Sequence, residues 1–354
     1  MRDGSSPAGP PRVILSESAS ASVVANKPKV GIILPVRNNA PFIRQSLQSV
    51  LRQSYDNIDV LVIDGASTDG TQDVVRSFSS VRLVSEPDRG QAEATNKGMD
   101  RMDSDIIGIL CGDDVLAPDA VRIAVETFTS FPDAEIVFGK VGKVDESGNQ
   151  VSPGDRFGDF DVKRVLLHNP RFPCTSYPST TAFLQTSLLK RTGFRFDDGI
   201  RTCPDFDMWL QLGLRGKVVY VPTVLAYWRE HAESGSVRGD FRRVIIESKR
   251  RALDKFFADE SLSADLQRLQ PVAYAILEIV DSSCHLIAHG SIMKGLSGVL
   301  RKVKRAPRVL AYPHVYGLVL RALVIGILRS ARLYNRARAM RMSLGRLFDM
   351  SRAN

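Results

Sequence analysis

Short apolar runs rich in β-branched residues alternate with helical periods along the first part of the chain. The runs end at turn-forming residues, whereas the segments between them place apolar side chains three and four residues apart. Strands are predicted at 30–34, 58–63, 81–85, 106–110 and 135–141, and helices at 42–53, 72–78, 91–102 and 118–130. This alternation implies βαβ crossovers, so we expect an α/β fold with a mostly parallel sheet covered by helices on both faces.

The pattern after residue 151 is less regular. It predicts, in order, a loop at 157–178, a strand leading into a helix at 180–189, a helix that opens at 203, short strands at 218–220 and 224–228, and helices across 240–290.

Acidic side chains follow several of the predicted strands. Asp64 and Asp88 come after the second and third strands, and the pair Asp113–Asp114 comes after the fourth. In an open parallel sheet, ligands bind beyond the carboxyl ends of the strands. Carboxylates repel one another and gather mainly around a cation or a ligand rich in hydrogen-bond donors. One crevice holding these acids is therefore the main functional expectation.

Two other nucleotide-binding classes fit poorly. The loop after the first strand, 35–39 (PVRNN), lacks the G-x-G-x-x-G of dinucleotide-binding domains, and no Walker-type glycine-rich loop occurs.

The 4 cysteines form no C-x-x-C pair, so neither a zinc site nor a disulfide framework is indicated.

Five motifs, in order along the chain, resemble those of glycosyltransferase family 2. They are 35–38 (PVRN), 49–54 (SVLRQS), 62–71 (VIDGASTDGT), 86–90 (EPDRG) followed by 96–98 (NKG), and 112–114 (GDD). The resemblance is strong over about 29–145 and continues loosely to about 236 through 204–210 (PDFDMWL) and 227–231 (YWREH). It implies a GT-A fold, a nucleotide-sugar donor, a divalent metal and inversion at the anomeric carbon.

The resemblance also implies a set of residues that bind the nucleotide sugar. They are Pro35, Val36, Asn38, Asp64, Asp88, Gly90, Asn96, Asp113 and Arg229. Asp64 would accept a hydrogen bond from the base imide, and Asp88 would contact base or ribose. The alternatives are that Asp64 only caps the turn that follows it and that Asp88 pairs with Arg89.

By the family pattern, Asp114 and Asp113 would bind Mg²⁺ or Mn²⁺, and His231 would reach the metal or the pyrophosphate from a later loop. A hard cation held by carboxylates stabilises the charge that develops on a pyrophosphate leaving group. The plainer alternatives are a helix N-cap before Pro118 and a histidine satisfied by its neighbours.

Inverting transfer needs a base that takes the proton of the acceptor hydroxyl. Asp205 matches the family's catalytic aspartate, although Pro204 stands where the family usually has glutamate. Asp207 is the competing candidate, and both could instead be first-turn acids favoured by the helix dipole. The Gln-x-x-Arg-Trp signature of processive members is absent after Gln211, so transfer of a single sugar is expected.

The net charge of +9 divides unevenly along the chain. Residues 291–354 hold 14 Lys/Arg and one acid, Asp349, so this segment carries +13 and residues 1–290 sum to −4. Its uncharged stretches are far shorter than the roughly 20 residues of a membrane span. We expect basic amphipathic helices that lie on an anionic membrane surface; a nucleic-acid arm and a solvated helix that packs on the acidic body are the alternatives.

The expected organisation has four parts: a disordered tail at 1–27, a GT-A domain at 28–236 divided at 145/146 into nucleotide-sugar and acceptor halves, a helical region at 237–290, and the membrane-associating segment 291–354. The first 27 residues show no signal-type hydrophobic region. The expected activity is transfer of a sugar, from UDP-sugar in particular, to a lipid-linked or glycan acceptor in cell-surface polysaccharide assembly, at the cytoplasmic face. No nucleic-acid partner is expected. The alternative functions are a non-catalytic nucleotide-sugar regulator and a nucleic-acid-binding protein.

Overall fold

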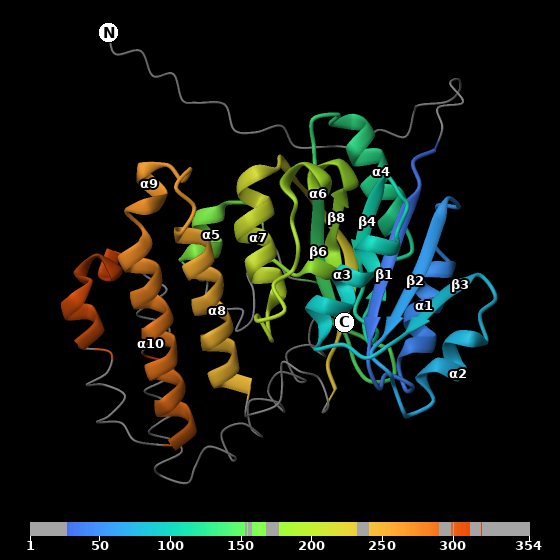
Figure 1. Ribbon diagram of the computed structural model, residues 1–354, viewed down its shortest axis with the longest axis horizontal. Coiled ribbons are helices and arrows are strands. Elements are labelled where there is room, and N and C mark those ends of the chain that lie inside the picture. The colour runs from blue at the N-terminus through green and yellow to red at the C-terminus, as the bar shows by residue number, and fades with distance from the viewer. Residues whose placement is uncertain are drawn as a thin grey trace, which may run out of the picture.

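The computed structural model describes residues 27–152, 154, 158–167, 177–231, 241–289, 299, 301–311 and 320. These residues form a twisted sheet with helices on both faces and a further group of helices at one end (Figure 1). Apart from Lys27, the predicted tail at 1–27 lies outside the described residues, and so does most of 291–354. No helix in the described part of the chain has the length and apolar character needed to cross a bilayer.

The sheet joins a parallel half to a mixed half. Its strands are β1 (Val30–Val36), β2 (Ile58–Asp64), β3 (Val81–Ser85), β4 (Ile106–Ile109), β5 (Val115–Leu116), β6 (Ile136–Val144), β7 (Gln150–Ser152), β8 (Ala182–Gln185) and β9 (Val218–Arg229). Their order is β3-β2-β1-β4-β8-β6-β9-β5, and β7 pairs with β6. Pairing is parallel from β3 to β4 and between β6 and β9, whereas β8, β5 and β7 pair antiparallel with their neighbours. The predicted parallel order thus holds for the first half.

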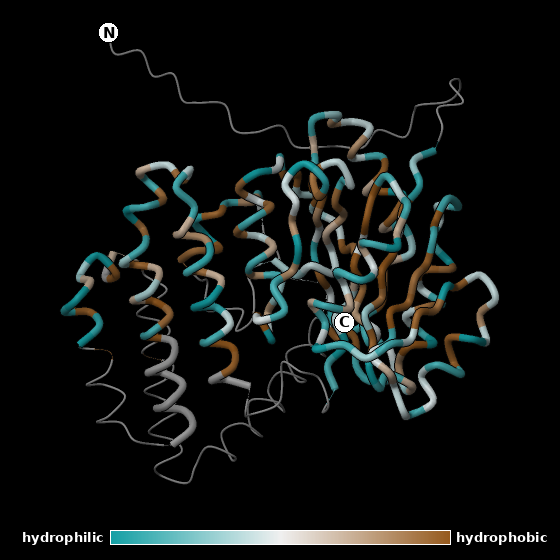
Figure 2. The backbone as a smooth tube through the Cα atoms, viewed as in Figure 1, coloured by the Kyte–Doolittle hydropathy of each residue, from teal (hydrophilic) through white to brown (hydrophobic). Residues whose placement is uncertain are grey.

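Both faces of the sheet are buried. In β2, Leu61 and Ile63 face one hydrophobic cluster and Val60 and Val62 face the other, as expected for a continuous apolar strand between two helical layers. Figure 2 shows the most hydrophobic residues concentrated along these strands.

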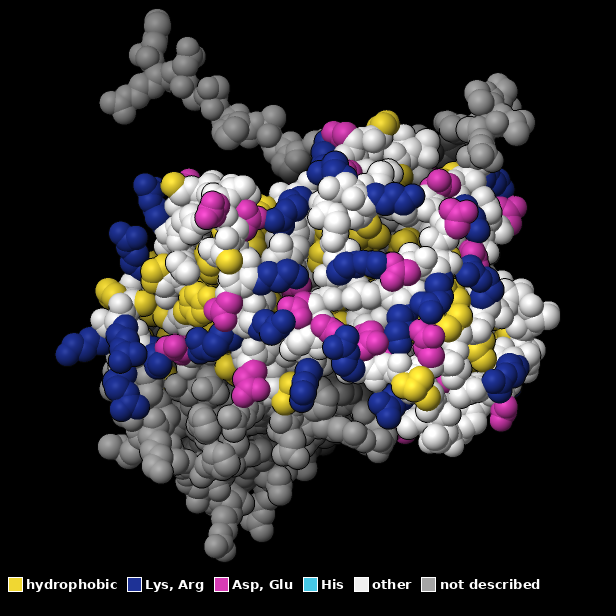
Figure 3. All heavy atoms as spheres, in the orientation of Figure 1, with side chains coloured by type: hydrophobic (Ala, Val, Ile, Leu, Met, Phe, Trp, Pro, Cys, Tyr) yellow, Lys and Arg dark blue, Asp and Glu magenta, His cyan; other side chains and the backbone are white. Residues whose placement is uncertain are grey.

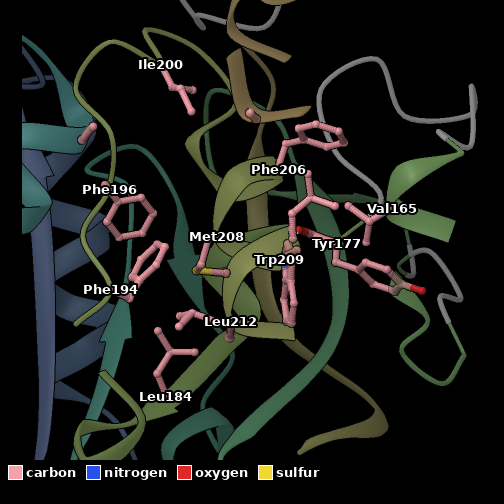
Figure 4. Packing of buried hydrophobic residues seen from close by; sticks show 14 of the residues in the cluster. Val165, Tyr177, Leu184, Phe194, Phe196, Ile200, Phe206, Met208, Trp209 and Leu212 are labelled. Carbon is pink, nitrogen blue, oxygen red and sulfur yellow. The ribbon is translucent and has the colours of Figure 1, made fainter. Parts of the chain in front are cut away.

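Helices cover the two faces in unequal numbers. Three helices pack on one face: α1 (Ile43–Leu51), α2 (Thr71–Arg76) and α4 (Ala120–Ser130). The other face carries α3 (Gln91–Arg101), α5 (Val162–Leu166), α6 (Thr186–Thr192) and α7 (Pro204–Arg215), and a short 3-10 turn, Ser179–Thr181, precedes β8. The side chains of Met208, Trp209 and Leu212 are fully buried, and Figure 4 shows them packed among the aromatic side chains around α7. This packing fixes the orientation of α7.

The helical region after β9 belongs to the same core as the sheet. It comprises α8 (Phe241–Phe257), α9 (Ala264–Gln267), α10 (Gln270–His289) and the 3-10 turn Pro307–Ala311. Leu253 and Phe256 of α8 and Leu277 of α10 lie in one hydrophobic cluster with α7 and the sheet. Figure 3 shows charged side chains of both signs interspersed over the face that includes these helices.

Three strands differ from the sequence expectation. The two short strands predicted at 218–220 and 224–228 are one continuous strand, β9, which pairs with β6 across bulges. The strands β5 and β7 are only two and three residues long. Strands this short carry no periodicity that a sequence pattern can reveal, and they exist because longer neighbours pair with them.

Candidate active site

The carboxyl ends of three adjacent parallel strands meet at the candidate site. Val36 at the end of β1 lies opposite Asp64 at the end of β2, and Asp64 lies opposite Ser85 at the end of β3. The loop after β4 reaches the same edge, because a Cβ atom at Gly112 would lie 2.5 Å from the Val36 side chain. The acids after these strands therefore share one edge, as predicted.

Asp64 is fully buried, and one of its carboxylate oxygens is already bonded. Oδ2 accepts hydrogen bonds from the Ser85 hydroxyl at 2.6 Å and from the Ser67 amide at 3.1 Å. Oδ1 has no hydrogen-bond partner among the described residues. A buried, unpaired carboxylate oxygen is costly unless a ligand supplies a donor. Asp64 thus does cap its own turn through one oxygen, and it keeps the other oxygen for a ligand.

Asp88 lies against the loop that follows Asp64. Its Oδ2 atom would be 2.5 Å from a Cβ atom at Gly65, so a larger residue at that position would displace the Asp88 carboxylate. Its Oδ1 atom accepts a hydrogen bond from the Gly90 amide at 2.9 Å, and burial raises its pKa above the ordinary value. Arg89 pairs with Glu93 and Asp198 rather than with Asp88. The carboxylate of Asp88 is therefore not neutralised by its neighbour in sequence.

The loops of the site hold strained backbone. Among the described residues, the non-glycine residues with positive φ are Asn38, Ala66 and Cys203, at 54°, 56° and 54°. They follow β1, follow β2 and precede α7, respectively, and such strain clusters at functional sites. Asn38 also binds the neighbouring loop, since its amide donates to the Ser67 hydroxyl and its Oδ1 accepts from the Thr68 amide. Asn38 therefore connects the loop after β1 to the loop after β2, and the residue itself is exposed.

The pair Asp113–Asp114 forms the centre of a candidate metal site. Asp114 is buried and accepts a hydrogen bond from the Arg229 amide at 3.1 Å. Burial, followed by the negative charge of Asp113, raises the pKa of Asp114 well above its usual range. The Nε2 atom of His231 lies 3.0 Å from Oδ2 of Asp113, and its Nδ1 atom has no partner in the described part of the chain. The Arg229 guanidinium partly offsets the charge of the two aspartates, and two carboxylates beside an imidazole are a ligand set that fits a divalent cation.

Cys111 is a member of this group that the sequence analysis did not identify. Its sulfur and the carboxylate oxygens of Asp113 and Asp114 lie within 4.8 Å of one another. Burial, and then the charges of Asp114, Asp113 and Asp205, raise the pKa of the Cys111 thiol. A cysteine two residues before an acidic pair was the available signal. Because the thiolate is the form that binds metals, the carboxylates of Asp113 and Asp114 are the stronger candidate ligands of this group.

Arg229, predicted to bind the nucleotide sugar, instead makes its contacts inside the protein. Its guanidinium is buried and donates to the backbone carbonyl groups of Asp113, Asp145 and Glu146 and to the Gln45 side chain. Nε and both terminal nitrogens are thus engaged inside the protein, so a direct phosphate contact does not fit this geometry. Arg229 instead joins the end of β9 to the loop that carries Asp113 and Asp114.

Asn96 also acts inside the protein. Its side chain donates to the carbonyl group of Phe196 at 2.8 Å and accepts from the amide of the same residue at 2.9 Å. This paired contact attaches α3 to the segment that leads to α7. Because both polar groups of the side chain are used, the predicted nucleotide contact does not fit, whereas a supporting role does.

Asp205 lies in the first turn of α7, close enough to Cys111 of the candidate metal site for the two groups to interact electrostatically. Desolvation raises its pKa to about 7, although the nearby Lys249 and backbone amides favour the charged form. A carboxyl group with a pKa near neutrality is suited to general acid–base chemistry. The first turn is set by Cys203 in the left-handed conformation and by Pro204 at the first helical position, where proline is favoured. Proline at 204 therefore has a structural reason where the family usually has glutamate.

Asp207, the competing candidate, points into the protein. It is 1% exposed, and its Oδ2 atom accepts a hydrogen bond from the Lys255 ammonium group of α8 at 2.7 Å. The Lys255 side chain is 37% exposed, and the Oδ1 atom of Asp207 has no hydrogen-bond partner among the described residues. A carboxylate that already pairs with an ammonium group is less available as a base than one without such a partner. The geometry therefore favours Asp205.

Residues 31–193 match the model of the family described as Glycosyl transferase family 2. This segment is a family 2 glycosyltransferase domain. The match ends within α6 and its C-cap, so α7 with Asp205, β9 with Arg229, and His231 lie beyond it.

Relatives of the family 2 domain include characterised and uncharacterised proteins. The uncharacterised protein y4gI of Sinorhizobium fredii is 28% identical over 66% of this chain and 26% of its own length. Chondroitin synthase of Pasteurella multocida is 23% identical over 81% of this chain and 29% of its own length. An uncharacterised glycosyltransferase of Rickettsia felis is 25% identical, with 59% and 35% covered. This chain thus spans 26–35% of the length of these relatives.

Solved structures establish the fold of the family 2 domain as GT-A. S. aureus TarS in complex with UDP-GlcNAc superposes with a TM-score of 0.56, at 13% identity, over 86% of this chain and 92% of that chain. A mannosyltransferase of Pyrobaculum calidifontis, in complex with GDP-Man and Mn²⁺, gives a TM-score of 0.55 at 20% identity, with 86% and 87% covered. The GT-A expectation is therefore confirmed.

Proposed function

We propose that this protein is a metal-dependent, inverting glycosyltransferase that moves one sugar from a nucleotide sugar, in particular a UDP-sugar, to an acceptor hydroxyl. The observation that carries the proposal is the convergence of Asp64, the pair Asp113–Asp114 and Asp205 at one edge of a family 2 domain. Similar proteins that bind UDP-GlcNAc or GDP-Man with Mn²⁺ support it.

The donor is bound through its base and its phosphates. The unpaired Oδ1 atom of Asp64 accepts the imide N–H of uracil, a donor that cytosine lacks. Pro35 and Val36 are buried at the end of β1 and form the adjoining wall. Asp88 contacts the ribose or base beside Gly65. The diphosphate would meet the cation held by Asp113, Asp114 and His231.

The chain's own residues divide the chemistry between them. Asp114, Asp113 and His231 would hold the cation, with Cys111 at its edge; a bound Mg²⁺ or Mn²⁺ supplies Lewis-acid stabilisation of the leaving diphosphate. Asp205 takes the proton of the acceptor hydroxyl as its oxygen bonds to the anomeric carbon from the side opposite the departing phosphate oxygen. The bond between the anomeric carbon and the phosphate oxygen breaks. The nucleoside diphosphate leaves, and the configuration at the anomeric carbon of the product is inverted.

The acceptor and the location extend this proposal. We infer a lipid-linked or glycan acceptor in cell-surface polysaccharide assembly, supported by the likeness to chondroitin synthase. The +13 charge of 291–354 supports peripheral attachment to an anionic leaflet at the cytoplasmic face. Flotation of the full chain with anionic liposomes, compared with neutral liposomes, tests this attachment; equal flotation with both would contradict it.

Donor turnover tests the central proposal. The purified chain is expected to hydrolyse a UDP-sugar slowly in Mn²⁺, to stop when the metal is chelated, and to lose both Mn²⁺ binding and turnover on Asp114→Asn. Asp119→Asn is the matched control, because Asp119 is an exposed acid at the start of α4 that pairs with Arg122. Turnover that survives both chelation and Asp114→Asn would rule out the metal-dependent mechanism.

A further inference from the structure

A short helical segment after α10 packs along that helix. Residues 301–305 are helical, and the 3-10 turn Pro307–Ala311 follows them. The Ala306 amide donates to the carbonyl group of Lys302, and the Val309 amide donates to the carbonyl group of Ala306, both at 3.0 Å. In Figure 1 this segment lies beside α10, at the end of the molecule opposite β3.

The apolar side of the segment is buried against α10. Val299 and Val309 are 5% and 0% exposed, and they share a hydrophobic cluster with Ile276 and Ile279 of α10. Val303 packs against the same cluster. An amphipathic helix binds a membrane by burying its apolar face among the lipids, and here α10 already occupies that face. The segment can therefore enter a bilayer only by leaving α10.

The other side of the segment carries exposed cations. They are Arg301, Lys304 and Arg305, which are three and four residues apart on one side of the helix, and Arg308 in the 3-10 turn; we call these four residues the basic stripe. None of the four forms an ion pair with a residue that the structure describes, whereas Lys302 pairs with Glu278 of α10 at 2.5 Å. Figure 3 shows Lys and Arg side chains gathered at this end of the molecule.

The sequence around the basic stripe supplies no opposite charge. Residues 291–311 contain no Asp or Glu, and Glu278, which faces the segment from α10, already pairs with Lys302 and Arg250. The stripe is thus a local concentration of positive charge on a side of the segment that the protein does not cover.

We propose that the basic stripe is the surface through which the protein contacts the phosphate head groups of an anionic membrane, by charge and without insertion of the segment. The proposal rests on the membrane attachment inferred above and gives that attachment a surface and a mode. Cations close to an anionic leaflet are attracted to it within about one Debye length.

A membrane fits the basic stripe better than a nucleic acid does. Both polyanions attract Lys and Arg, but the sequence that continues from the stripe is apolar. Residues 309–328 contain no acid, and Arg321 is their one Lys or Arg. Cations beside an apolar run are typical of membrane-surface segments, whereas arms that bind nucleic acid are blocks of like charge.

Vesicle binding by the full chain tests the proposal. The vesicles are phosphatidylcholine with phosphatidylglycerol, and phosphatidylcholine alone is the neutral reference. The stripe variant replaces all four cations by Gln, which keeps helix propensity. At about 0.1 M salt it is expected to bind anionic vesicles about 10²–10³-fold more weakly than the wild type, since each cation near the surface strengthens binding about fivefold. At about 1 M salt the difference is expected to vanish, because the Debye length falls to about 3 Å.

The matched control removes the same charge elsewhere. It replaces by Gln four exposed cations in or beside α1, α2 and α6: Arg44, Arg52, Arg76 and Lys190. The control is expected to bind vesicles as the wild type does. Equal losses from the two variants, or no loss from the stripe variant, would overturn the proposal while leaving the attachment of the chain in place.

Val309 tests whether the apolar side of the segment faces protein or lipid. Val309→Asn is expected to lower the thermal unfolding midpoint of the full chain without vesicles, because this side chain is buried against α10. An unchanged midpoint would show that α10 does not hold the segment, and would overturn binding by charge alone.

Two outcomes separate this proposal from its neighbours. A wild-type chain that binds duplex DNA but not anionic vesicles would refute the proposal in favour of a nucleic-acid partner. Vesicle binding requires neither donor nor acceptor. A chain that turns over no nucleotide sugar would therefore refute the proposed glycosyltransferase activity, and the vesicle measurements would still decide the role of the basic stripe.

Discussion

Two parts of the candidate site are built in different ways. The donor side is the part at the ends of β1 to β3, with Asp64 and Asp88, and the acceptor side is the part formed by the loop after β4, α7 and the end of β9. On the donor side, at the ends of β1 to β3, the groups that hold the acids lie in the same or neighbouring loops: Asp64 is held by Ser67 and Ser85, and Asp88 by Gly90. On the acceptor side, the Arg229 side chain donates to the carbonyl group of Asp113, and the Lys255 ammonium group of α8 donates to the carboxylate of Asp207. The first side is organised by strand register, and the second by contacts between distant segments.

This difference predicts how far the structural effect of a substitution extends from the substituted residue. A change on the donor side alters one contact, because the strand ends are fixed by a buried sheet. A change on the acceptor side releases a whole segment, because single side chains such as Arg229 and Asn96 join elements about 100 residues or more apart. Three substitutions on the acceptor side, together with one internal control, test this expectation, from the largest expected effect to the smallest.

Loss of the base should have the largest effect. Asp205→Asn is expected to lower kcat about 10²–10⁴-fold, the usual contribution of a general base, with donor affinity unchanged. In the wild type, the pKa of about 7 predicts that kcat/KM rises with pH until the carboxylate is ionised and then levels off, and a bound cation should move this limb to lower pH. Steady-state kinetics from pH 5 to 9, at about one-unit steps, measure both effects.

Asp207→Asn is the internal control for Asp205. It removes a carboxylate two residues away that pairs with Lys255, so it should reduce stability and keep the pH limb. Equal losses of kcat from the two variants would mean that the α7 turn as a whole, rather than one carboxylate, is required.

Arg229→Met should be the most damaging change to the fold. It leaves buried carbonyl groups without their donor, each at about 1–3 kcal/mol, so the free energy of unfolding is expected to fall by about 3 kcal/mol or more. Mn²⁺ affinity should fall with it, because the Asp114 contact with β9 loosens. Urea unfolding and calorimetric titration measure the two. Arg122→Met is the control, since Arg122 forms an exposed pair on α4; unchanged stability in Arg229→Met would contradict the assigned role.

Asn96→Ala should give the smallest effect. It removes the paired contact with Phe196, at a cost of about 1–2 kcal/mol for two partly buried hydrogen bonds. Donor affinity should be retained, whereas kcat falls slightly because the segment before α7 becomes looser. A sharp loss of donor affinity with unchanged stability would instead indicate that Asn96 contacts the nucleotide directly.

The donor side was largely predictable from sequence. The strands that end at Asp64 and before Asp113 are continuous apolar runs buried on both faces, so their pattern is strong. Since parallel strands end at one edge, the position of each acid followed from the strand that precedes it. The candidate metal pair Asp113–Asp114 and the candidate base Asp205 were predicted by motif resemblance, and their roles stay predictions.

The acceptor side was less predictable for physical reasons. The roles of Arg229 and Asn96 depend on partners that lie 83–184 and 100 residues away, respectively, and no local pattern encodes such contacts. A polar residue in a motif has the same sequence signal whether it touches a ligand or fixes a loop. Cys111 was missed because a cysteine beside an apolar strand usually packs as a small hydrophobic residue.

The shared core of α7 and α8 bears on how this protein can be divided. A fragment that stops after β9 would keep every candidate catalytic acid but would uncover the apolar face that meets Ile246, Leu253 and Phe256. Such a surface promotes aggregation. The family 2 segment and the helices that follow it are therefore one unit for truncation, domain exchange or fusion, although the match to the family model ends at residue 193, well before α8 begins.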